Sequence, residues 1–167
     1  MSMIHEGPLP TSATCFICGE DNPCGLHGRF YLEGNRVVLP LCIDDNHCGY
    51  PGVVHGGIVA AALDECMGWA AACAIQRMCV TGELVVRYLK PTPPHVPLRV
   101  YAESTKKSRL LVKTTAWVED EAGVRYAQAE GRFLPLTKEQ TIEIDDGMCY
   151  KGDEVRVFED IKTPSGA

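Results

Sequence analysis

Apolar residues along the chain predict one long helix and a series of strands. The helix is expected from Gly56 to about Arg77, because this stretch is rich in alanine and other helix formers. Apolar residues occur on every face of it, so other parts of the chain have to cover it. The apolar run from Ile58 to Ile75 is interrupted by Asp64-Glu65, which favours a core helix over a membrane span.

Stretches rich in β-branched and aromatic residues predict the strands. A hairpin is expected before the helix, with strands at 28–32 and 36–43 around a turn at 33–35. Four strands are expected after it, at 79–89, 98–105, 110–119 and 124–134, separated by turn signals. Short connections favour an antiparallel sheet, and the helix stands apart from the run of strands. The sequence therefore predicts an α+β fold in which a curved sheet wraps the helix.

The ends of the chain give weaker signals. Residues 1–27 are rich in Cys, Pro and Gly and are expected to form an ordered but irregular leader. The main domain is expected at 28–136, and an acidic extension at 137–167 with one candidate strand at 155–158. With 167 residues and 46% hydrophobic content, one domain is expected.

Charge and cysteine usage narrow the classes of function. A net charge of −6 and a pI near 5.3 argue against binding to nucleic acid or to an anionic membrane, so a small-molecule partner is favoured. The first residues lack the pattern of a secretory signal. The nine cysteines are odd in number and several lie in apolar surroundings, which favours free thiols in a reducing cytoplasm.

The start of the helix is a candidate anion site. Gly56 and Gly57 allow close approach of a ligand, and amides in a first helical turn have no partners inside the helix. Together with the helix dipole, these amides can polarise a carbonyl and stabilise an oxyanion. For the preceding His55 we favour a side-chain hydrogen bond that fixes the loop, with lining of the pocket as the alternative.

Asp64 is the candidate acid. It follows Gly57 by seven residues, close to two helical turns, and therefore lies on nearly the same face. Its apolar neighbours should desolvate it and raise its pKa. The two residues lie roughly 10 Å apart along the helix axis, so one carbonyl cannot contact both. Two copies with antiparallel helices would remove this conflict, which predicts a dimer with shared sites.

A simpler interpretation carries equal weight from the spacing alone. In it, residues 55–57 form a tight junction between loop and helix, and Asp64-Glu65 faces water.

Several motifs together resemble the hot-dog acyl-CoA thioesterases, specifically the branch similar to those of the phenylacetate pathway. The resemblance covers about residues 15–136. It is carried by Cys15-Phe16-Ile17-Cys18-Gly19, Asn22-Pro23, Gly25-Leu26, the loop from Gly49-Tyr50-Pro51-Gly52 to His55-Gly56-Gly57, Leu63-Asp64-Glu65, Val80-Thr81 and Tyr88-Leu89-Lys90-Pro91.

The resemblance implies a hot-dog fold and the hydrolysis of an acyl-CoA without metal or organic cofactor. It also implies a homodimer in which two sheets join, with a dimer of dimers as the alternative. It implies that the Gly56 and Gly57 amides hold the carbonyl, and that Asp64 attacks it or activates water. Asp64 is preferred to Glu65 because its offset matches the family's acid, whereas Glu65 is rotated by about 100°. Thr81 resembles a position whose hydroxyl orients the water or the acid; an ordinary strand residue is the alternative.

Further candidates are expected to contact substrate. They are His47, Val54, Glu65, Met67, Gly82 and Lys90, although a methionine on this helix is more often core. Lys90, with Lys106, Lys107 and Arg109, could meet the phosphates of CoA or be solvated turn residues.

The leader contains ligand types suited to zinc. Cys15, Cys18, Cys24 and His27 are of this kind, but a single Cys-x-x-Cys is a weak signal. The resemblance implies a structural cap, so we expect a tight turn without metal.

The sequence thus predicts an acyl-CoA thioesterase of unspecified acyl chain. The main alternative is a non-catalytic acyl-CoA binding or sensing protein. A hot-dog hydratase is disfavoured, since its differently placed His-Asp pair is not found.

Overall fold

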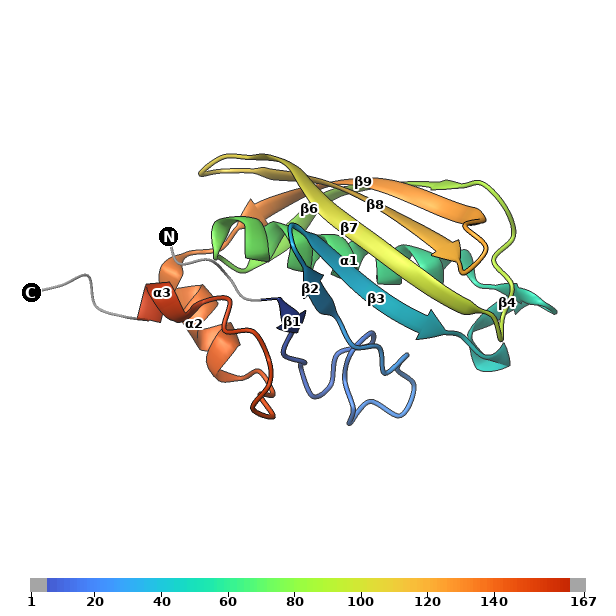
Figure 1. The fold of residues 1–167 in the computed structure, drawn as a ribbon, viewed down its shortest axis with the longest axis horizontal. Helices are drawn as coiled ribbons and strands as arrows, with labels where there is room; N and C mark the ends of the chain where they lie inside the picture. Colours follow the sequence, from blue (N-terminus) through green and yellow to red (C-terminus); the bar gives the residue numbers. More distant parts are fainter. Residues whose placement is uncertain (1–5, 163–167) are drawn as a thin grey trace, which may run out of the picture.

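A seven-stranded antiparallel sheet curves around one long helix, α1 (Gly56–Ile75), in the computed structural model, which describes residues 6–162 (Figure 1). The strand order is β1-β2-β3-β7-β8-β9-β6, so β6 forms one edge. Every neighbouring pair is antiparallel, and the predicted α+β arrangement is confirmed. The strands are β1 (Gly7–Pro8), β2 (Tyr31–Glu33), β3 (Arg36–Cys42), β6 (Cys79–Tyr88), β7 (Pro97–Lys107), β8 (Val112–Asp120) and β9 (Arg125–Pro135).

Both ends of α1 are capped by hydrogen bonds to backbone groups that have no partner inside the helix. His55 caps its start, and Gln76 ends it in the left-handed conformation, with φ of 53° and its N–H donating to Ala72 O. By length and composition alone α1 could cross a membrane. It packs against β3, β6, β7, β8 and β9, which is the arrangement of the core helix that was predicted.

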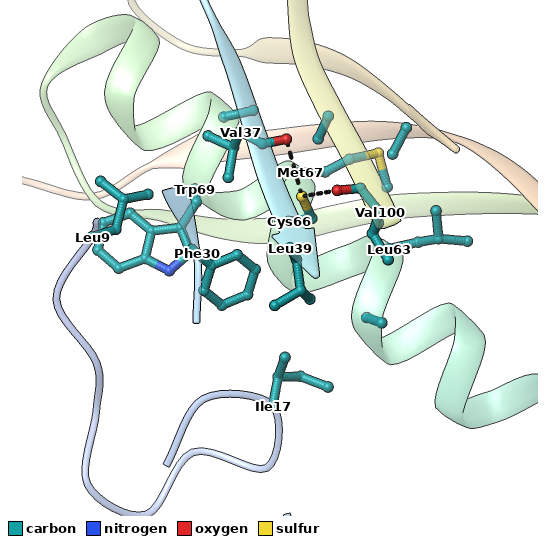
Figure 2. Close-up of a cluster of buried hydrophobic side chains, with 14 of the residues drawn as sticks. Leu9, Ile17, Phe30, Val37, Leu39, Leu63, Cys66, Met67, Trp69 and Val100 are labelled. Atoms are coloured by element: carbon teal, nitrogen blue, oxygen red, sulfur yellow. Dashed lines mark hydrogen bonds between the residues drawn. The ribbon is translucent and has the colours of Figure 1, made fainter. Parts of the chain in front are cut away.

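The centre of the core lies where α1 crosses β3 and β7 (Figure 2). Cys66 is fully buried there, and its thiol donates to Val37 O at 3.5 Å and to Val100 O at 3.7 Å. These weak bonds join α1 to both strands, and the neighbouring side chains of Leu63 and Met67 have no exposed surface.

Both flanks of the predicted main domain contribute to the same core. Leu9 and Ile17 of the leader are buried in it, as are Val157 and Phe158 near the other end. Phe158 stacks on Trp69 of α1, with ring centroids 6.5 Å apart. The domain boundaries at 27 and 136 stay a prediction, but the flanking segments are packed parts of one structure.

One expectation for residues 137–167 is wrong, and one helix there was missed. Residues 155–158 form no strand, because Val157 and Phe158 lie in a turn and bury their side chains against the core. A helix that was not predicted, α2 (Lys138–Asp146), begins at Thr137 with a capping box that Gln140 completes. The Thr-x-x-Gln spacing is a signal for this helix start. A short α3 (Glu159–Lys162) follows.

The loop before α1 contains three short elements. They are η1 (Asp45–His47), β4 (Cys48–Tyr50) and β5 (Val53–Val54). The pair β4 and β5 brings the chain back to α1, where Val54 N–H donates to Thr92 O at 2.9 Å. This bond attaches the start of the helix to the segment that follows β6.

Replacing Leu63 with alanine should lower the free energy of unfolding by about 2–5 kcal/mol, since its buried side chain would leave a cavity. Leu110→Ala is the matched control, because Leu110 is 79% exposed and its truncation should change stability by less than about 0.5 kcal/mol. Urea unfolding at one fixed protein concentration measures both. Equal losses in the two variants would contradict the central position given to α1.

Candidate active site

The N-terminal end of α1 opens into a cleft of about 540 Å³. It is lined by residues 49, 50 and 53–56 of the loop and helix start, by residues 88–92, and by Val59 of α1. Val54, His55, Gly56 and Lys90, all candidates from the sequence, line this cleft. We call it the amide cleft.

One amide of the first helical turn is free for a ligand. Gly57 N–H donates to His55 Nδ1 at 2.9 Å, while Ile58 and Val59 donate to His55 O at 2.9 and 3.2 Å. The His55 ring thus makes the loop-fixing hydrogen bond that we favoured. Gly56 N–H has no acceptor within residues 6–162. Of the two amides expected to hold a carbonyl, Gly56 is therefore available and Gly57 is engaged.

Tyr88 holds Gly56 in place. Its hydroxyl donates to Gly56 O at 2.7 Å, and its ring lies beside the Gly56 Cα. No role was predicted for Tyr88, which belongs to the motif Tyr88-Leu89-Lys90-Pro91. Its place at the end of a strand, next to the Lys-Pro turn, was the available signal.

Asp64 lines a second cleft, of about 290 Å³, together with Thr81. Thr81 Oγ1 donates to Asp64 Oδ1 at 2.8 Å. Burial raises the pKa of Asp64, and the hydrogen bond from Thr81 opposes that rise. Trp69, Phe133 and Met78 add apolar surface to this cleft. We call it the acid cleft.

Glu65 turns away from Asp64 toward the leader. Its Oε1 lies 3.4 Å from Cys15 Sγ, in a hydrogen bond. Burial, followed by the charge on Cys15, raises the pKa of Glu65 to about 8. The pKa of Cys15 is lowered to about 5, mainly by a hydrogen bond from Cys18. The pKa of Cys18 is raised by its hydrogen bond with Cys15 and by burial. The two adjacent acids of α1 therefore have different surroundings.

The two clefts share no lining residue. His55 and Gly56 lie in one, and Asp64 and Thr81 lie in the other, as the helical rise predicts. Asp64 is half-buried and hydrogen-bonded, which disfavours the alternative of a simply solvated acid. Within one chain the candidate site exists only as two separate halves.

Other sequence candidates lie outside both clefts. His47 bonds through Nδ1 to Asp44 Oδ1 and through Nε2 to Cys24 O, both at 3.0 Å, so it anchors the leader. The carbonyl of Cys24, then Asp44, raises its pKa against the effect of burial. Met67 is core, and Gly82 lies in the β-bulge between Thr81 and Glu83.

The basic candidates do not gather at one place. Lys90 lies at the amide cleft, whereas Lys107 and Arg109 line a separate cleft at the other end of α1. Lys107 Nζ donates there to Ala74 O at 3.0 Å. Only Lys90 is positioned beside the free amide.

Known proteins give a consistent comparison. Residues 51–127 match the family model of the thioesterase superfamily. The sequence matches no curated protein. A crystal structure of a thioesterase superfamily protein aligns at 25% identity with a TM-score of 0.68, covering 73% of this chain and 60% of that one. This chain therefore spans less than two thirds of that relative's length.

Two further structures share the fold at lower identity. A hypothetical thioesterase from Streptococcus pneumoniae with coenzyme A aligns at 19% identity and TM-score 0.57, over 60% of this chain and 78% of that one. The same protein was solved with a threonine, and separately an aspartate, replaced by alanine. The E. coli PaaI protein of the phenylacetic acid degradation operon aligns at 14% identity and TM-score 0.61, over 67% and 81%.

The helix wrapped by a curved sheet is thus the hot-dog fold that the resemblance implied. Residues 51–127 are similar to the thioesterase superfamily, and the solved thioesterase structures share the fold of the helix and sheet.

Proposed function

We propose that the protein hydrolyses an acyl-CoA thioester to a free acid and CoA at sites completed by two copies of the chain. The observation that carries this proposal is the pair of half-sites: a free Gly56 amide in one cleft and a Thr81-bound Asp64 in the other. The coenzyme A bound to the Streptococcus pneumoniae relative supports this substrate class.

The edge strand β6 supplies the argument for a dimer. Among the described residues it pairs only with β9, and Val80, Val85 and Tyr88 expose apolar surface along it. Thr81 lies at its start beside the acid cleft, and Tyr88 lies at its end beside the amide cleft. Antiparallel pairing of two β6 strands would therefore place the amide cleft of one copy next to the acid cleft of the other.

In the completed site, the thioester carbonyl oxygen accepts a hydrogen bond from Gly56 N–H. The dipole of α1 stabilises the negative charge that develops on this oxygen. The Asp64 carboxylate either attacks the carbonyl carbon or takes a proton from a water that attacks it. When water attacks, the carbon–sulfur bond breaks and the CoA sulfur receives the proton from Asp64. When Asp64 attacks, the carbon–sulfur bond breaks to give an anhydride on Asp64 and a CoA thiolate. Water then hydrolyses the anhydride to the free acid, which restores the Asp64 carboxylate and supplies a proton to the thiolate. Thr81 holds the carboxylate in position for either route.

The linings of the two clefts suggest where each part of the substrate lies. Trp69, Phe133 and Met78 would contact a medium-sized or aromatic acyl group in the acid cleft. Lys90 at the amide cleft would meet a phosphate of CoA. The cytoplasmic location stays a prediction from cysteine usage.

Asp64→Asn should lower kcat for thioester hydrolysis by about 10²–10⁴-fold, because the amide can neither attack nor accept the proton. Release of free thiol from a panel of acyl-CoAs measures the effect. Glu33→Gln is the matched control, since Glu33 is exposed at the end of β2 and lines neither cleft. Full activity in Asp64→Asn would remove Asp64 from the mechanism. If neither protein releases thiol while an acyl-CoA binds, the sensing function replaces hydrolysis.

Thr81→Val should lower kcat by about tenfold with little change in KM, because it removes one hydrogen bond to a charged carboxylate. Thr81→Ser keeps the hydroxyl and should restore most of kcat. Steady-state kinetics on the best substrate of the panel give both values. Equal loss in the serine and valine variants would show that the methyl group, not the hydroxyl, matters.

A further inference from the structure

A cluster of possible metal ligands lies beside the acid cleft and has no role in the proposed hydrolysis. It contains Cys15 and Cys18 of the leader and Glu65 of α1. Cys15 and Glu65 also line the acid cleft, whereas Cys18 is buried behind them. The fold therefore brings two thiols next to a carboxylate that is remote in sequence.

The spacing of the ligand atoms is close to that of a tetrahedral zinc site. One sulfur or oxygen from each residue lies within 4.8 Å of the other two, and Cys15 Sγ is 3.4 Å from Glu65 Oε1. Bond lengths of about 2.3 Å to sulfur and about 2.0–2.2 Å to oxygen place tetrahedral ligands about 3.5–3.8 Å apart. The separations of the three atoms are therefore within about 1 Å of that spacing.

The backbone around Cys15 is arranged for a thiolate. The N–H groups of Ile17 and Cys18 both point at Cys15 Sγ, at 3.3 and 3.5 Å. Hydrogen bonds of this kind stabilise a metal-bound sulfur and fix its orientation. Gly19 allows the tight turn, because a Cβ there would come within 2.5 Å of Cys15 O.

No basic side chain pairs with Glu65 in the part of the chain that the structure describes. The Glu65 side chain is partly buried. A carboxylate beside two thiols, with no basic side chain opposite, is a typical setting for a divalent ion of borderline softness.

The other ligand types of the leader lie elsewhere. Cys24 is exposed, and His27 Nδ1 is hydrogen-bonded to Gly19 O at 2.9 Å. The zinc-type set considered from the sequence, with Cys24 and His27 as members, is therefore not the one that the fold assembles.

We propose that Cys15, Cys18 and Glu65 bind one zinc-like divalent cation, with the fourth coordination position open to the acid cleft. The ion ties the leader to α1 one residue from Asp64. This proposal replaces the metal-free turn expected from the sequence, and it does not depend on the hydrolase activity.

Zinc binding to the full-length chain tests this proposal directly. Protein stripped with a chelator and reduced should bind one equivalent of Zn²⁺ per chain and gain thermal stability as zinc is added. Cd²⁺ in place of Zn²⁺ should produce the thiolate-to-metal absorption band. Cys15→Ser, Cys18→Ser and Glu65→Gln should each weaken zinc binding by at least about 100-fold.

Cys24→Ser is the matched control and should bind zinc as the wild type does. Circular dichroism shows whether each variant folds. If a cysteine variant does not fold, Glu65→Gln still tests the site, because it keeps the shape of the side chain. The proposal is overturned if the reduced wild type binds no zinc, or if Glu65→Gln binds it unchanged. Loss of binding in Cys24→Ser would also overturn it, in favour of a site within the leader.

Discussion

The packing of α1 into the core is the constraint on which the rest of the structure depends. Because the sheet and both flanking segments cover its apolar surface, its polar backbone is accessible chiefly at its ends. The start of the helix therefore becomes the place where an anion or a carbonyl can be bound. The same packing leaves few positions for an acid, and Asp64 and Glu65 occupy two of them at the margin of the core.

The adjacent acids Asp64 and Glu65 have different hydrogen-bond partners because they point in different directions from the helix. Asp64 meets a hydroxyl from β6, while Glu65, rotated by about 100°, meets a thiol from the leader. One acid is thereby held at the edge strand proposed to pair with a second copy. The other faces the segment that covers the helix, where a proton or a metal ion can neutralise it.

The local patterns predicted most of the fold, since alanine content marks α1 and β-branched residues mark the strands. The patterns wrongly predicted a strand at 155–158, because apolar and polar residues alternate in Val-Arg-Val. The stacking of Phe158 on Trp69, which a local pattern does not contain, decides the conformation there instead. The separation of Asp64 from Gly57 followed from helical geometry, whereas the choice of Asp64 as the acid also rested on the resemblance. The capture of the Gly57 amide by His55, and the contact of Glu65 with Cys15, depend on side-chain placement that no spacing rule supplies.

The central claim is that each site combines Gly56 of one copy with Asp64 of another, and subunit complementation tests it most directly. Gly56→Pro deletes the free amide but suits the first helical position, since His55 already has φ of −59° and ψ of 131°. Gly56→Ala keeps the amide and is its control.

Gly56→Pro and Asp64→Asn should each be nearly inactive alone. When the two are unfolded and refolded together in equal amounts, half of the dimers are mixed and each has one intact site. The mixture should then recover about a quarter of wild-type activity. No recovery, with mixed dimers demonstrated by mass spectrometry, would contradict the shared site.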